Sequence, residues 1–295
     1  MATLRLGTCS WKFPSWVGLV YSTPEGDPEG HGYLVEYARR YHTVEIDQWF
    51  WSLFGPETIG LPKPEDVTRY RAGVPDDFRF SIKAPNSLTL THFYQKADEP
   101  LTPNPHFLSV ELFTTFLELL TPLRPLLGPL MFQFEYLNRQ KMATQARFQA
   151  LFGAFRRALP EGPAYALEVR NPQYLNRAYF QFLEAFDLVP VLVQGYWMPD
   201  IRDLYAEWRE SLWAHPTVVI RLMGPDRQAI EALAPEGWNR VILPKDDELP
   251  GIASLVQELL DRDVDVYVNV NNHYEGSSPL TVEKLEALLG TQPTG

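Results

Sequence analysis

Side chains that could transfer protons or hold an anion recur at the ends of apolar runs in this sequence. Seven strand-like runs end in charged or amide residues: Thr43–Asp47, Phe80–Lys83, Leu130–Gln133, Ala166–Arg170, Val191–Gln194, Val219–Arg221 and Tyr267–Asn271. The early residues of these runs are apolar on both faces, and only the last ones are polar. This pattern is typical of a parallel strand that is buried on both faces and whose carboxyl end opens into a site.

Glu45, Asp47 and Glu168 are the candidate catalytic residues. Carboxylates on two sides of one site can divide the acid and base roles if their surroundings move their pKa values apart. The same side chains could instead only neutralise the basic residues of neighbouring strands in a buried ion-pair lattice. The sequence leaves both interpretations open, because burial perturbs the ionisation of structural and catalytic groups alike.

Lys83, Arg170 and Arg221, with His92 as a further cation, form a candidate anion site. The guanidinium fork of arginine suits phosphate and carboxylate, so a small anionic molecule is the expected ligand. Further candidate ligand contacts are Gln133, Asn269, Asn271, Asn272 and the loop aromatics Trp11 and Trp16. The amides could bind hydroxyl or carbonyl groups, and the rings could either stack on a sugar or base or pack the loops.

No cofactor and no metal are expected. The six histidines show no ligand spacing, and no P-loop, dinucleotide fingerprint or nucleophile elbow stands at a strand-to-helix junction. An oxygen site for Mg²⁺ or Mn²⁺ at the three carboxylates, with His273 or His92, is the alternative. Cys9 is the only cysteine, which excludes an intrachain disulfide, and a lone buried thiol is expected there.

The charge balance limits the expected partners. The chain of 295 residues carries 26 Lys and Arg against 37 Asp and Glu, which gives a net charge of −11. Such a surface repels nucleic acid and anionic membranes, so neither is expected to bind. Met1–Gly7 lacks the basic start and apolar stretch of a secretory signal, and no run approaches the length of a membrane span. A cytoplasmic location is expected, and the oligomeric state stays open.

Strands alternate with helical patterns along the whole chain. The expected strands are Leu4–Gly7, Val44–Asp47, Phe78–Lys83, Pro129–Phe134, Tyr165–Val169, Val189–Gln194, Val218–Leu222 and Val266–Val270. The expected helices are Tyr33–Tyr41, Glu65–Ala72, Ser109–Leu120, Thr144–Leu159, Arg177–Phe186, Leu204–Trp213 and Val282–Leu289, with two further helical stretches, Arg227–Leu233 and Ile252–Asp261, between the seventh and eighth strands. Eight βα units predict the α/β class and a single (β/α)8 TIM-like barrel domain over residues 1–295.

Loop lengths indicate which end of this barrel carries the site. Long loops follow the first three strands, at Thr8–Gly32, Gln48–Pro64 and Ala84–Leu108, whereas the loops from a helix to the next strand are short. Barrel enzymes elaborate the loops at the carboxyl ends of their strands, so the long loops and the polar strand ends should meet at one mouth. One ambiguity remains, because Val241–Leu243 could be an extra strand or the true seventh strand in place of the run near Val219.

An ordered series of short motifs also spans nearly the whole chain. The motifs are Gly7–Trp11, Trp16, Val44–Asp47, Phe78–Pro85, Thr91–His92, Gln133–Phe134, Glu168–Arg170, Arg221–Gly224 and Asn271–Asn272. Together they resemble the successive motifs of the DUF72, or YecE-like, family. The resemblance implies a TIM-barrel-like fold and no particular activity.

Four positions differ from the usual pattern of that family. Asp47 stands for an asparagine, Asn171 and Met223 stand for histidines, and Gln194 stands for an aspartate. Two imidazoles that could transfer protons are therefore replaced. Either this chain is a divergent or inactive member, or its chemistry does not need them.

The favoured interpretation is an acid–base enzyme that acts on a small polar anionic ligand at the barrel mouth. Glu45 and Glu168 would be general acid and base, and the three cations would hold the ligand or stabilise charge in the transition state. The alternatives are a non-catalytic ligand-binding or sensor protein, a glycoside hydrolase-like enzyme and a divalent-metal isomerase-like enzyme. Gln133 and Arg221 weigh against the glycosidase, since many such barrels have carboxylates at these strand ends.

Overall fold

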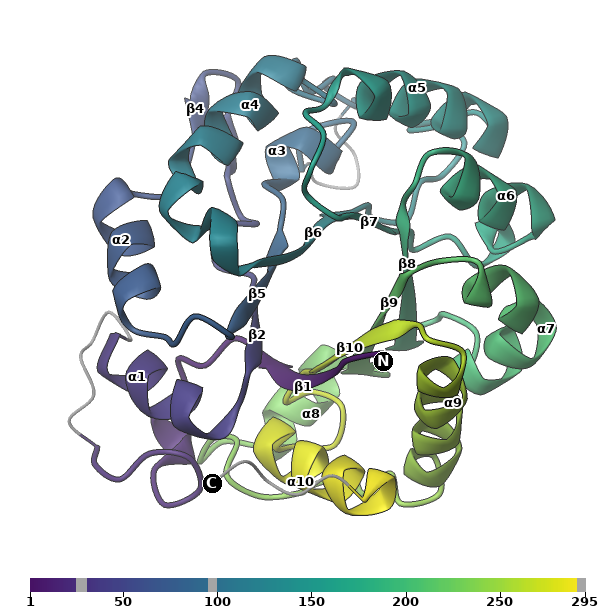
Figure 1. Cartoon of the computed structure of the whole chain (residues 1–295). Helices are drawn as coiled ribbons and strands as arrows, with labels where there is room; N and C mark the ends of the chain where they lie inside the picture. The colour runs from purple at the N-terminus through teal and green to yellow at the C-terminus, as the bar shows by residue number, and fades with distance from the viewer. Residues whose placement is uncertain (25–30, 95–99, 291–295) are drawn as a thin grey trace.

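The protein is a closed barrel of eight parallel strands in the computed structural model, which describes residues 1–24, 31–94 and 100–290 (Figure 1). The barrel strands are β1 (Leu4–Cys9), β2 (Thr43–Ile46), β5 (Arg79–Lys83), β6 (Leu127–Gln133), β7 (Tyr165–Glu168), β8 (Val189–Gly195), β9 (Thr217–Gly224) and β10 (Asp265–Val270). Each strand pairs in parallel with its neighbours, and β1 closes the ring by pairing with both β10 and β2. The predicted α/β class and TIM-like barrel are thus confirmed.

Helices surround the strands on the outside of the ring (Figure 1). They are α1 (His31–Arg40), α2 (Pro64–Ala72), α3 (Asn86–Thr89), α4 (Val110–Leu119), α5 (Gln145–Ala158), α6 (Arg177–Ala185), α7 (Ile201–Trp213), α8 (Arg227–Leu233), α9 (Leu249–Asp261) and α10 (Ser278–Leu289). Short polar side chains cap several of them: the Ser109 hydroxyl, for example, accepts the Leu112 N–H at 3.1 Å at the start of α4. None of the described helices is long and apolar enough to cross a membrane.

The seventh barrel strand is β9, which resolves the ambiguity between the runs near Val219 and at Val241–Leu243. Val241–Leu243 belongs to no strand. The Ile242 and Leu243 N–H groups donate instead to the Glu275 carbonyl, just beyond β10. The segment between β9 and β10 therefore holds α8 and an irregular stretch before α9, the helix that packs on the barrel.

The side chains inside the barrel form layers. Alternate residues of each strand face the barrel axis, and near the amino-terminal ends these are mainly apolar. Ala166, Val191 and Val219 belong to this buried layer. Further along the same faces stand Glu45, Glu168 and Arg221, and the inner layer thus changes from apolar to charged toward the carboxyl ends. The larger core lies between strands and helices, where aromatic rings such as Phe113 and Phe132 pack together.

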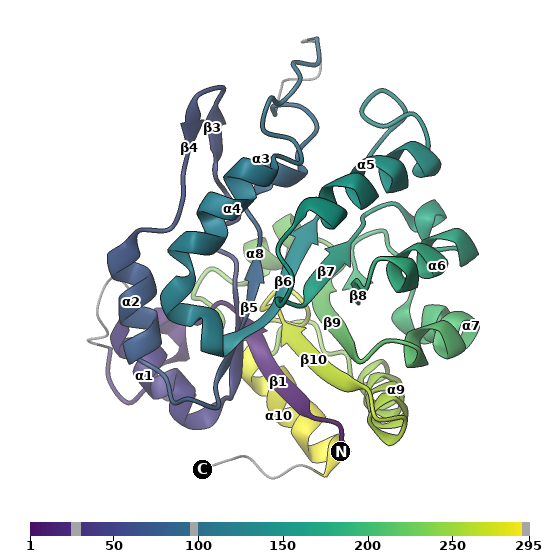
Figure 2. The same cartoon turned by 45° about the horizontal axis from the view of Figure 1, so that its top comes forward.

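The carboxyl ends of the strands carry the irregular structure. The loop after β2 contains a small hairpin of β3 (Leu53–Gly55) and β4 (Thr58–Ile59), and the loop after β5 contains α3. Figure 2 shows the hairpin and the described residues next after α3 rising beyond the barrel on this side. The loop asymmetry expected from the sequence is therefore present, and short ordered elements replace part of the expected irregular chain.

Candidate functional site

A cavity of about 540 Å³ opens at the carboxyl ends of the strands. Its deeper wall is polar and includes Asp47, Lys83, Gln133, Arg170 and Arg221. Its outer wall is largely aromatic and includes Phe50, Trp51, Tyr94, Tyr136, Tyr196, Trp197 and Trp238. A polar floor beneath an aromatic wall, at this size, is typical of a site for a small molecule.

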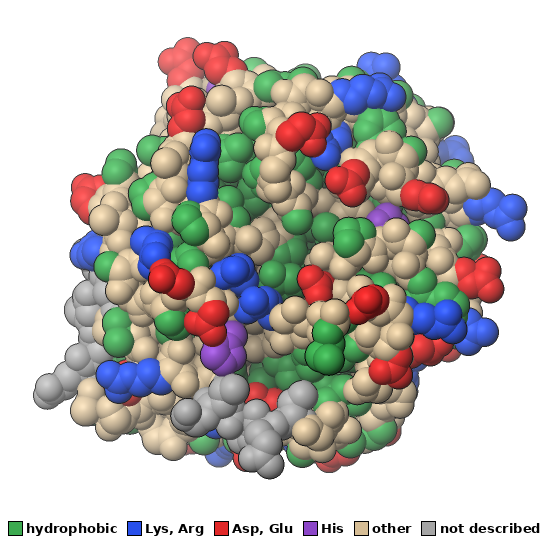
Figure 3. All heavy atoms as spheres, in the orientation of Figure 1, with side chains coloured by type: hydrophobic (Ala, Val, Ile, Leu, Met, Phe, Trp, Pro, Cys, Tyr) green, Lys and Arg blue, Asp and Glu red, His purple; other side chains and the backbone are tan. Residues whose placement is uncertain are grey.

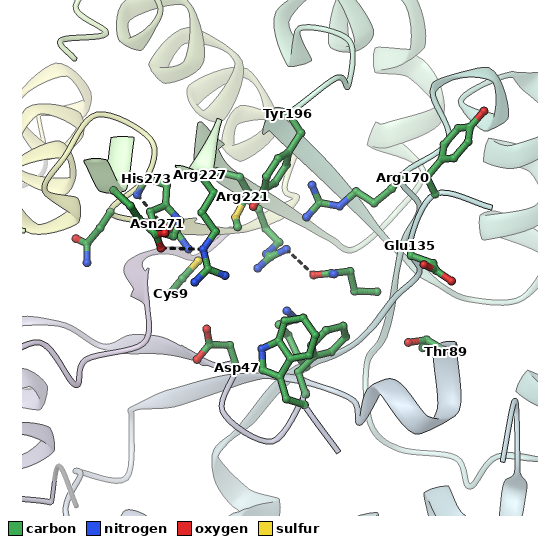
Figure 4. Close-up of a pocket in the computed structure, with 18 of the residues that line it drawn as sticks. Cys9, Asp47, Thr89, Glu135, Arg170, Tyr196, Arg221, Arg227, Asn271 and His273 are labelled. Carbon is green, nitrogen blue, oxygen red and sulfur yellow. Dashed lines mark hydrogen bonds and ion pairs between the residues drawn. The ribbon is translucent and has the colours of Figure 1, made fainter. Parts of the chain in front are cut away.

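Arg221, on β9, is the centre of the floor. Its guanidinium binds the Glu45 carboxylate through two hydrogen bonds of 2.8 and 2.6 Å and the Glu168 carboxylate through one of 2.7 Å. A fourth hydrogen bond of 3.2 Å reaches the Gln133 Oε1 atom and is drawn in Figure 4. Glu45 and Glu168 are fully buried, and Arg221 is 1% exposed. Four strands are thus joined through one side chain.

Arg170 extends this network toward the cavity. Its Nε atom lies 2.6 Å from Glu168 Oε1, although the two atoms are not aligned as a hydrogen bond. The guanidinium lies 4.5 Å from the centre of the Tyr196 ring, and Figure 4 shows both groups at one side of the cavity. The two Nη atoms of Arg170 make no hydrogen bond to a residue that the structure describes, so their donors remain for a ligand.

The electrostatics of Glu168 agree with a role in this lattice. Burial alone would raise the pKa of its carboxyl group, but Arg170, Arg221 and Lys83 outweigh burial and lower the pKa below its usual value. Glu168 is therefore an anion at neutral pH. Neither Glu168 nor Glu45 reaches the wall of the cavity; the structure places both beneath it, in ion pairs. Glu45 and Glu168 thus form the buried ion-pair lattice that was the alternative to a catalytic role.

Lys83, the last residue of β5, faces the cavity without a carboxylate partner. It makes no hydrogen bond or ion pair within the described ranges, and it is 8% exposed. Its Nζ atom lies 3.7 Å from the centre of the Phe50 ring, where the aromatic face takes the place of an anion. Burial and the neighbouring charge of Arg221 lower the pKa of Lys83 to about 8.

Asp47 follows β2 and also lines the cavity (Figure 4). Burial raises the pKa of its carboxyl group, Lys83 and Arg221 oppose that shift, and Glu45 adds to it. Cys9 lies close by in the wall, and burial raises the pKa of its thiol, so it is an unreactive neutral group, as expected. Asp47 and Lys83 are thus the titratable pair whose pKa values move toward neutrality.

The predicted asparagines have different surroundings. Asn269 is buried beside Glu45 and donates to Glu45 Oε2 at 3.3 Å, whereas Asn271 lines the cavity. Asn272 also lines the cavity, and its Oδ1 atom accepts the Ser278 N–H at 2.9 Å at the start of α10. Asn269 and Asn272 therefore both make hydrogen bonds that stabilise the fold.

Three predicted contacts lie away from the cavity. Trp11 and Trp16 are buried in the loop after β1, where Trp11 packs on Tyr70 and Trp16 packs between other rings. His92 is half-buried, and its Nδ1 atom lies 2.9 Å from the Thr91 hydroxyl. None of the three lines the cavity. The packing interpretation of the two tryptophans is the one that the structure shows.

Arg227, Glu231 and Trp238 line the cavity without a clear signal in the sequence, and the sequence indicated His273 only as a ligand of the alternative metal site. Arg227 and Glu231, from α8, form an ion pair at 2.8 Å, and His273 Nε2 lies 3.3 Å from Glu231. Burial lowers the pKa of His273, and Glu231 opposes that effect. Trp238 packs against the His273 imidazole. The available signal was the extra segment after β9, since insertions at this end of a barrel strand face the mouth.

The residues that differ from the family pattern also have defined places. Met223 lines the cavity beside Cys9, so a thioether stands where an imidazole was expected. The Asn171 side-chain amide accepts the Leu137 N–H and donates to the Leu137 carbonyl, both at 2.9 Å, and the Gln194 side chain accepts the Ile201 N–H at 2.9 Å. Asn171 and Gln194 therefore hold loops. Within the described ranges, no three His, Cys, Asp or Glu side chains come together as a metal site requires.

Known proteins similar to this chain share its fold. A DUF72 family protein from Thermotoga maritima superposes with a TM-score of 0.68 at 20% identity, covering 98% of this chain and 99% of that one. Another, from Enterococcus faecalis, has a TM-score of 0.69 at 19% identity and covers 98% and 96%. At such identities the likeness concerns the fold alone.

Sequence comparison gives the family. The chain is 29% identical over 174 residues to the UPF0759 protein YecE of Escherichia coli, which covers 59% of this chain. The matched part of this chain spans about half the length of that relative, 51%. The family described as "Protein of unknown function DUF72" matches residues 5–295. Since this match includes nearly every residue from the first strand onward, the chain belongs to the DUF72 family.

Proposed function

We propose that this protein is an acid–base enzyme that binds a small anionic molecule in the cavity at the barrel mouth. The observation that carries the proposal is a pair of cations with unused donors on the cavity wall. The Nζ atom of Lys83 and the Nη atoms of Arg170 make no hydrogen bond to a described residue. Each is buried, so a bound phosphate or carboxylate would meet both cations in a medium of low dielectric constant.

The charge balance of the floor explains why these two cations matter. Glu45, Glu168 and Arg221 saturate one another below the cavity wall. Lys83 and Arg170 remain above them, and Asp47 is the carboxyl group on the same wall. An anionic group would therefore replace the missing partner of Lys83.

The same geometry assigns the acid and base roles to residues other than the two glutamates expected from the sequence. Glu45 and Glu168 are held in ion pairs, and the low pKa of Glu168 makes it a poor proton donor. Asp47 and Lys83 have pKa values shifted toward neutrality and face the cavity. We assign proton transfer to these two residues, with His273, also in the cavity lining, as a further base. Arg170 would orient the ligand, and the aromatic outer wall would cover its less polar part.

A binding or sensor protein is the second candidate, and Met223 favours it. Met223 occupies the cavity wall where relatives are expected to carry an imidazole, so one proton-transfer group is absent from this member. Both candidates require anion binding. They differ in whether a bound molecule is converted.

Anion binding is testable by thermal melting in phosphate and in chloride at equal ionic strength. The parent should melt at a higher temperature in phosphate, because a ligand of the folded state stabilises it by mass action. Arg170→Gln should lose that gain. The matched control is Arg139→Gln, at an exposed arginine outside the cavity, which should keep it. No response of the parent to phosphate, sulfate or small carboxylates would contradict both candidates.

A further inference from the structure

Lys83 differs from three other lysines of the chain, which form ion pairs. Lys141, Lys245 and Lys284 each bind a carboxylate at 2.6 to 2.8 Å. Lys83 is more deeply buried than these three, and its Nζ atom lies over the Phe50 ring with no carboxylate of a described residue within ion-pair distance. Burial and the charge of Arg221 lower its pKa, and the more distant carboxylates Glu45, Asp47 and Glu168 oppose that shift without cancelling it. A buried lysine without a carboxylate at ion-pair distance is costly to keep as an ammonium ion, so the fold shifts its equilibrium toward the neutral form.

The neutral form of Lys83 is a nucleophile that points into a cavity. With its pKa at about 8, roughly one molecule in ten carries the free amine at pH 7. A desolvated lysine next to another cation is the usual arrangement of an amine that attacks carbonyl carbon. The Cys9 thiol, another potential nucleophile of the wall, is neutral and buried, so it does not compete.

The wall around Lys83 supplies the other requirements of this reaction. Asp47 lies on the same wall and is a carboxyl group that burial helps to protonate. Arg170 offers free donors for the anionic group of a substrate. The cavity volume of about 540 Å³ holds a metabolite of a few to about twenty heavy atoms.

We propose that Lys83 forms a Schiff base with the carbonyl group of a small anionic carbonyl compound, such as a 2-oxo acid or a phosphorylated ketone or aldehyde. This inference rests on the proposed function, since Arg170 must hold the anionic group while Lys83 meets the carbonyl carbon. It narrows the substrate class from any small anion to one with an electrophilic carbon.

The reaction balances as follows. The Lys83 nitrogen attacks the carbonyl carbon, a C–N bond forms, and the π electron pair moves to the oxygen, which takes a proton from Asp47. The nitrogen then returns one proton to Asp47, giving a neutral carbinolamine. Asp47 protonates the hydroxyl group, the C–O bond breaks, water leaves, and an iminium ion forms. The net change is one proton transferred from Asp47 to the adduct and one water released, without an oxidant or reductant.

The iminium ion would carry the same single positive charge as the ammonium form of Lys83. The cluster of Glu45, Glu168 and Arg221 therefore needs no rearrangement when the adduct forms. An iminium ion withdraws electrons from the bonds next to it, which allows a proton or a carbon group to leave. Asp47 or His273 could accept that proton, as the proposed function requires.

Borohydride trapping tests this proposal with pyruvate and glyoxylate as probes. The full-length protein is incubated with each probe, reduced with sodium borohydride, and analysed by intact mass and peptide mapping. Reduction of an iminium ion leaves a stable secondary amine on the attacked lysine. We expect one adduct per chain, located at Lys83, and suppression of that adduct by excess phosphate.

The controls separate Lys83 from surface amines. Lys83→Met should give no mapped adduct, and Lys63→Met, at an exposed lysine of the α2 start, should react like the parent. Acetone, which lacks the anionic group, should label Lys83 at least tenfold less than pyruvate. Since competition by phosphate is measured on the parent, the result does not depend on the folding of a variant.

Two negative results have different meanings. If phosphate raises the melting temperature through Arg170 but borohydride fixes neither probe on Lys83, the anion site stands and the Schiff base is wrong. If phosphate has no effect and adducts spread over exposed lysines, both the Schiff base and the proposed function are wrong.

Discussion

Arg221 is buried almost completely, and an unpaired charge in such a place would carry a large desolvation penalty. Two glutamates from β2 and β7 compensate it, and they use its Nε and both Nη atoms. A buried pair of this kind adds little net stability compared with apolar side chains, but removal of one partner leaves the others unpaired. Position 221 therefore matters for folding before it matters for any ligand.

The first prediction concerns this residue. Arg221→Met should lower the free energy of unfolding by about 3 to 5 kcal/mol, because Glu45 and Glu168 lose their shared cation in a buried site. Urea unfolding at pH 7 measures the change. A triple variant that adds Glu45→Gln and Glu168→Gln should recover much of the loss. A single variant as stable as the parent would exclude a structural role for the arginine.

The second prediction concerns Lys83 and pH. Its folded pKa of about 8 lies below the ordinary value of 10.5. Below pH 8 the amine is charged in both states, so the full cost of burial lowers stability. Between pH 8 and 10.5 the folded protein releases this proton first, and the cost disappears. Lys83→Met should therefore be more stable than the parent by up to about 3 kcal/mol at pH 7.

Urea unfolding of both proteins at several pH values provides the measurement. The gain from Lys83→Met should shrink steadily as the pH rises from 8 to 10.5. Lys63→Met, at an exposed position, should show no such trend. A gain that is constant with pH would mean that the methionine acts through packing and that Lys83 is fully charged in the folded protein.

The residue types of the site could be predicted from the sequence, but their pairing could not. Polar strand ends indicated Asp47, Lys83, Arg170 and Arg221 correctly as members of one region. Whether Glu45 would bind Arg221 or face a ligand depends on side-chain geometry across the barrel, which spacing along the chain does not contain. The aromatic content of the loops was equally ambiguous, since buried packing and ligand stacking favour the same residues.

At the scale of elements, a close approach of two strand ends shapes one wall of the cavity. Gly224 ends β9 with a φ of +79°, and a Cβ atom there would lie 2.0 Å from the His273 carbonyl oxygen. Gly195, at the end of β8, has a φ of +129°, and its missing Cβ would lie 2.3 Å from the Gly224 carbonyl oxygen. These two glycines allow β8, β9 and the segment after β10 to meet beneath the mouth.

The third prediction compares two glycines with positive φ. Gly224→Ala should destabilise the protein by at least about 2 kcal/mol, because strain and a backbone clash add. Gly290→Ala is the matched control: its φ is +66°, but no atom lies within 4 Å of the added Cβ. It should cost only about 1 kcal/mol. If urea unfolding gave equal losses of stability for the two variants, the backbone around Gly224 would be able to move away from the added Cβ atom at little cost.

The order and type of the main elements could be predicted because buried parallel strands have a strong apolar signal. The short elements could not. β3, β4 and α3 have two to four residues each, fewer than a periodic pattern needs. Val241–Leu243 has the composition of a strand, but β9 and β10 already pair with each other, so no place in the sheet remains.

On the scale of the whole molecule, the net charge of −11 opposes the approach of the proposed ligand. Figure 3 shows the face opposite the mouth, where cationic and anionic side chains are interspersed. The cavity floor is balanced as well, with three carboxylates against three cations. An anion therefore meets a repulsive field at a distance and favourable donors only on contact.

The fourth prediction follows from this contrast. The association rate constant of phosphate should rise when chloride increases from about 10 mM to about 150 mM, because the Debye length falls from about 30 Å to about 8 Å. Affinity should fall over the same range. Stopped-flow fluorescence can measure both, since Trp51, Trp197 and Trp238 line the cavity. A rate that falls with salt would mean that a local positive field steers the ligand.

The shared guanidinium of Arg221 has a consequence for how this protein can change over evolutionary time. Its partners lie 176 and 53 residues away along the chain, on different strands. Loss of any one of the three leaves a charge uncompensated in the interior, so single substitutions there are selected against. Descendants should therefore keep Glu45, Glu168 and Arg221 together or exchange them together. Residues of the aromatic outer wall, which lie on loops, are free to vary one at a time and to admit new ligands above an unchanged floor.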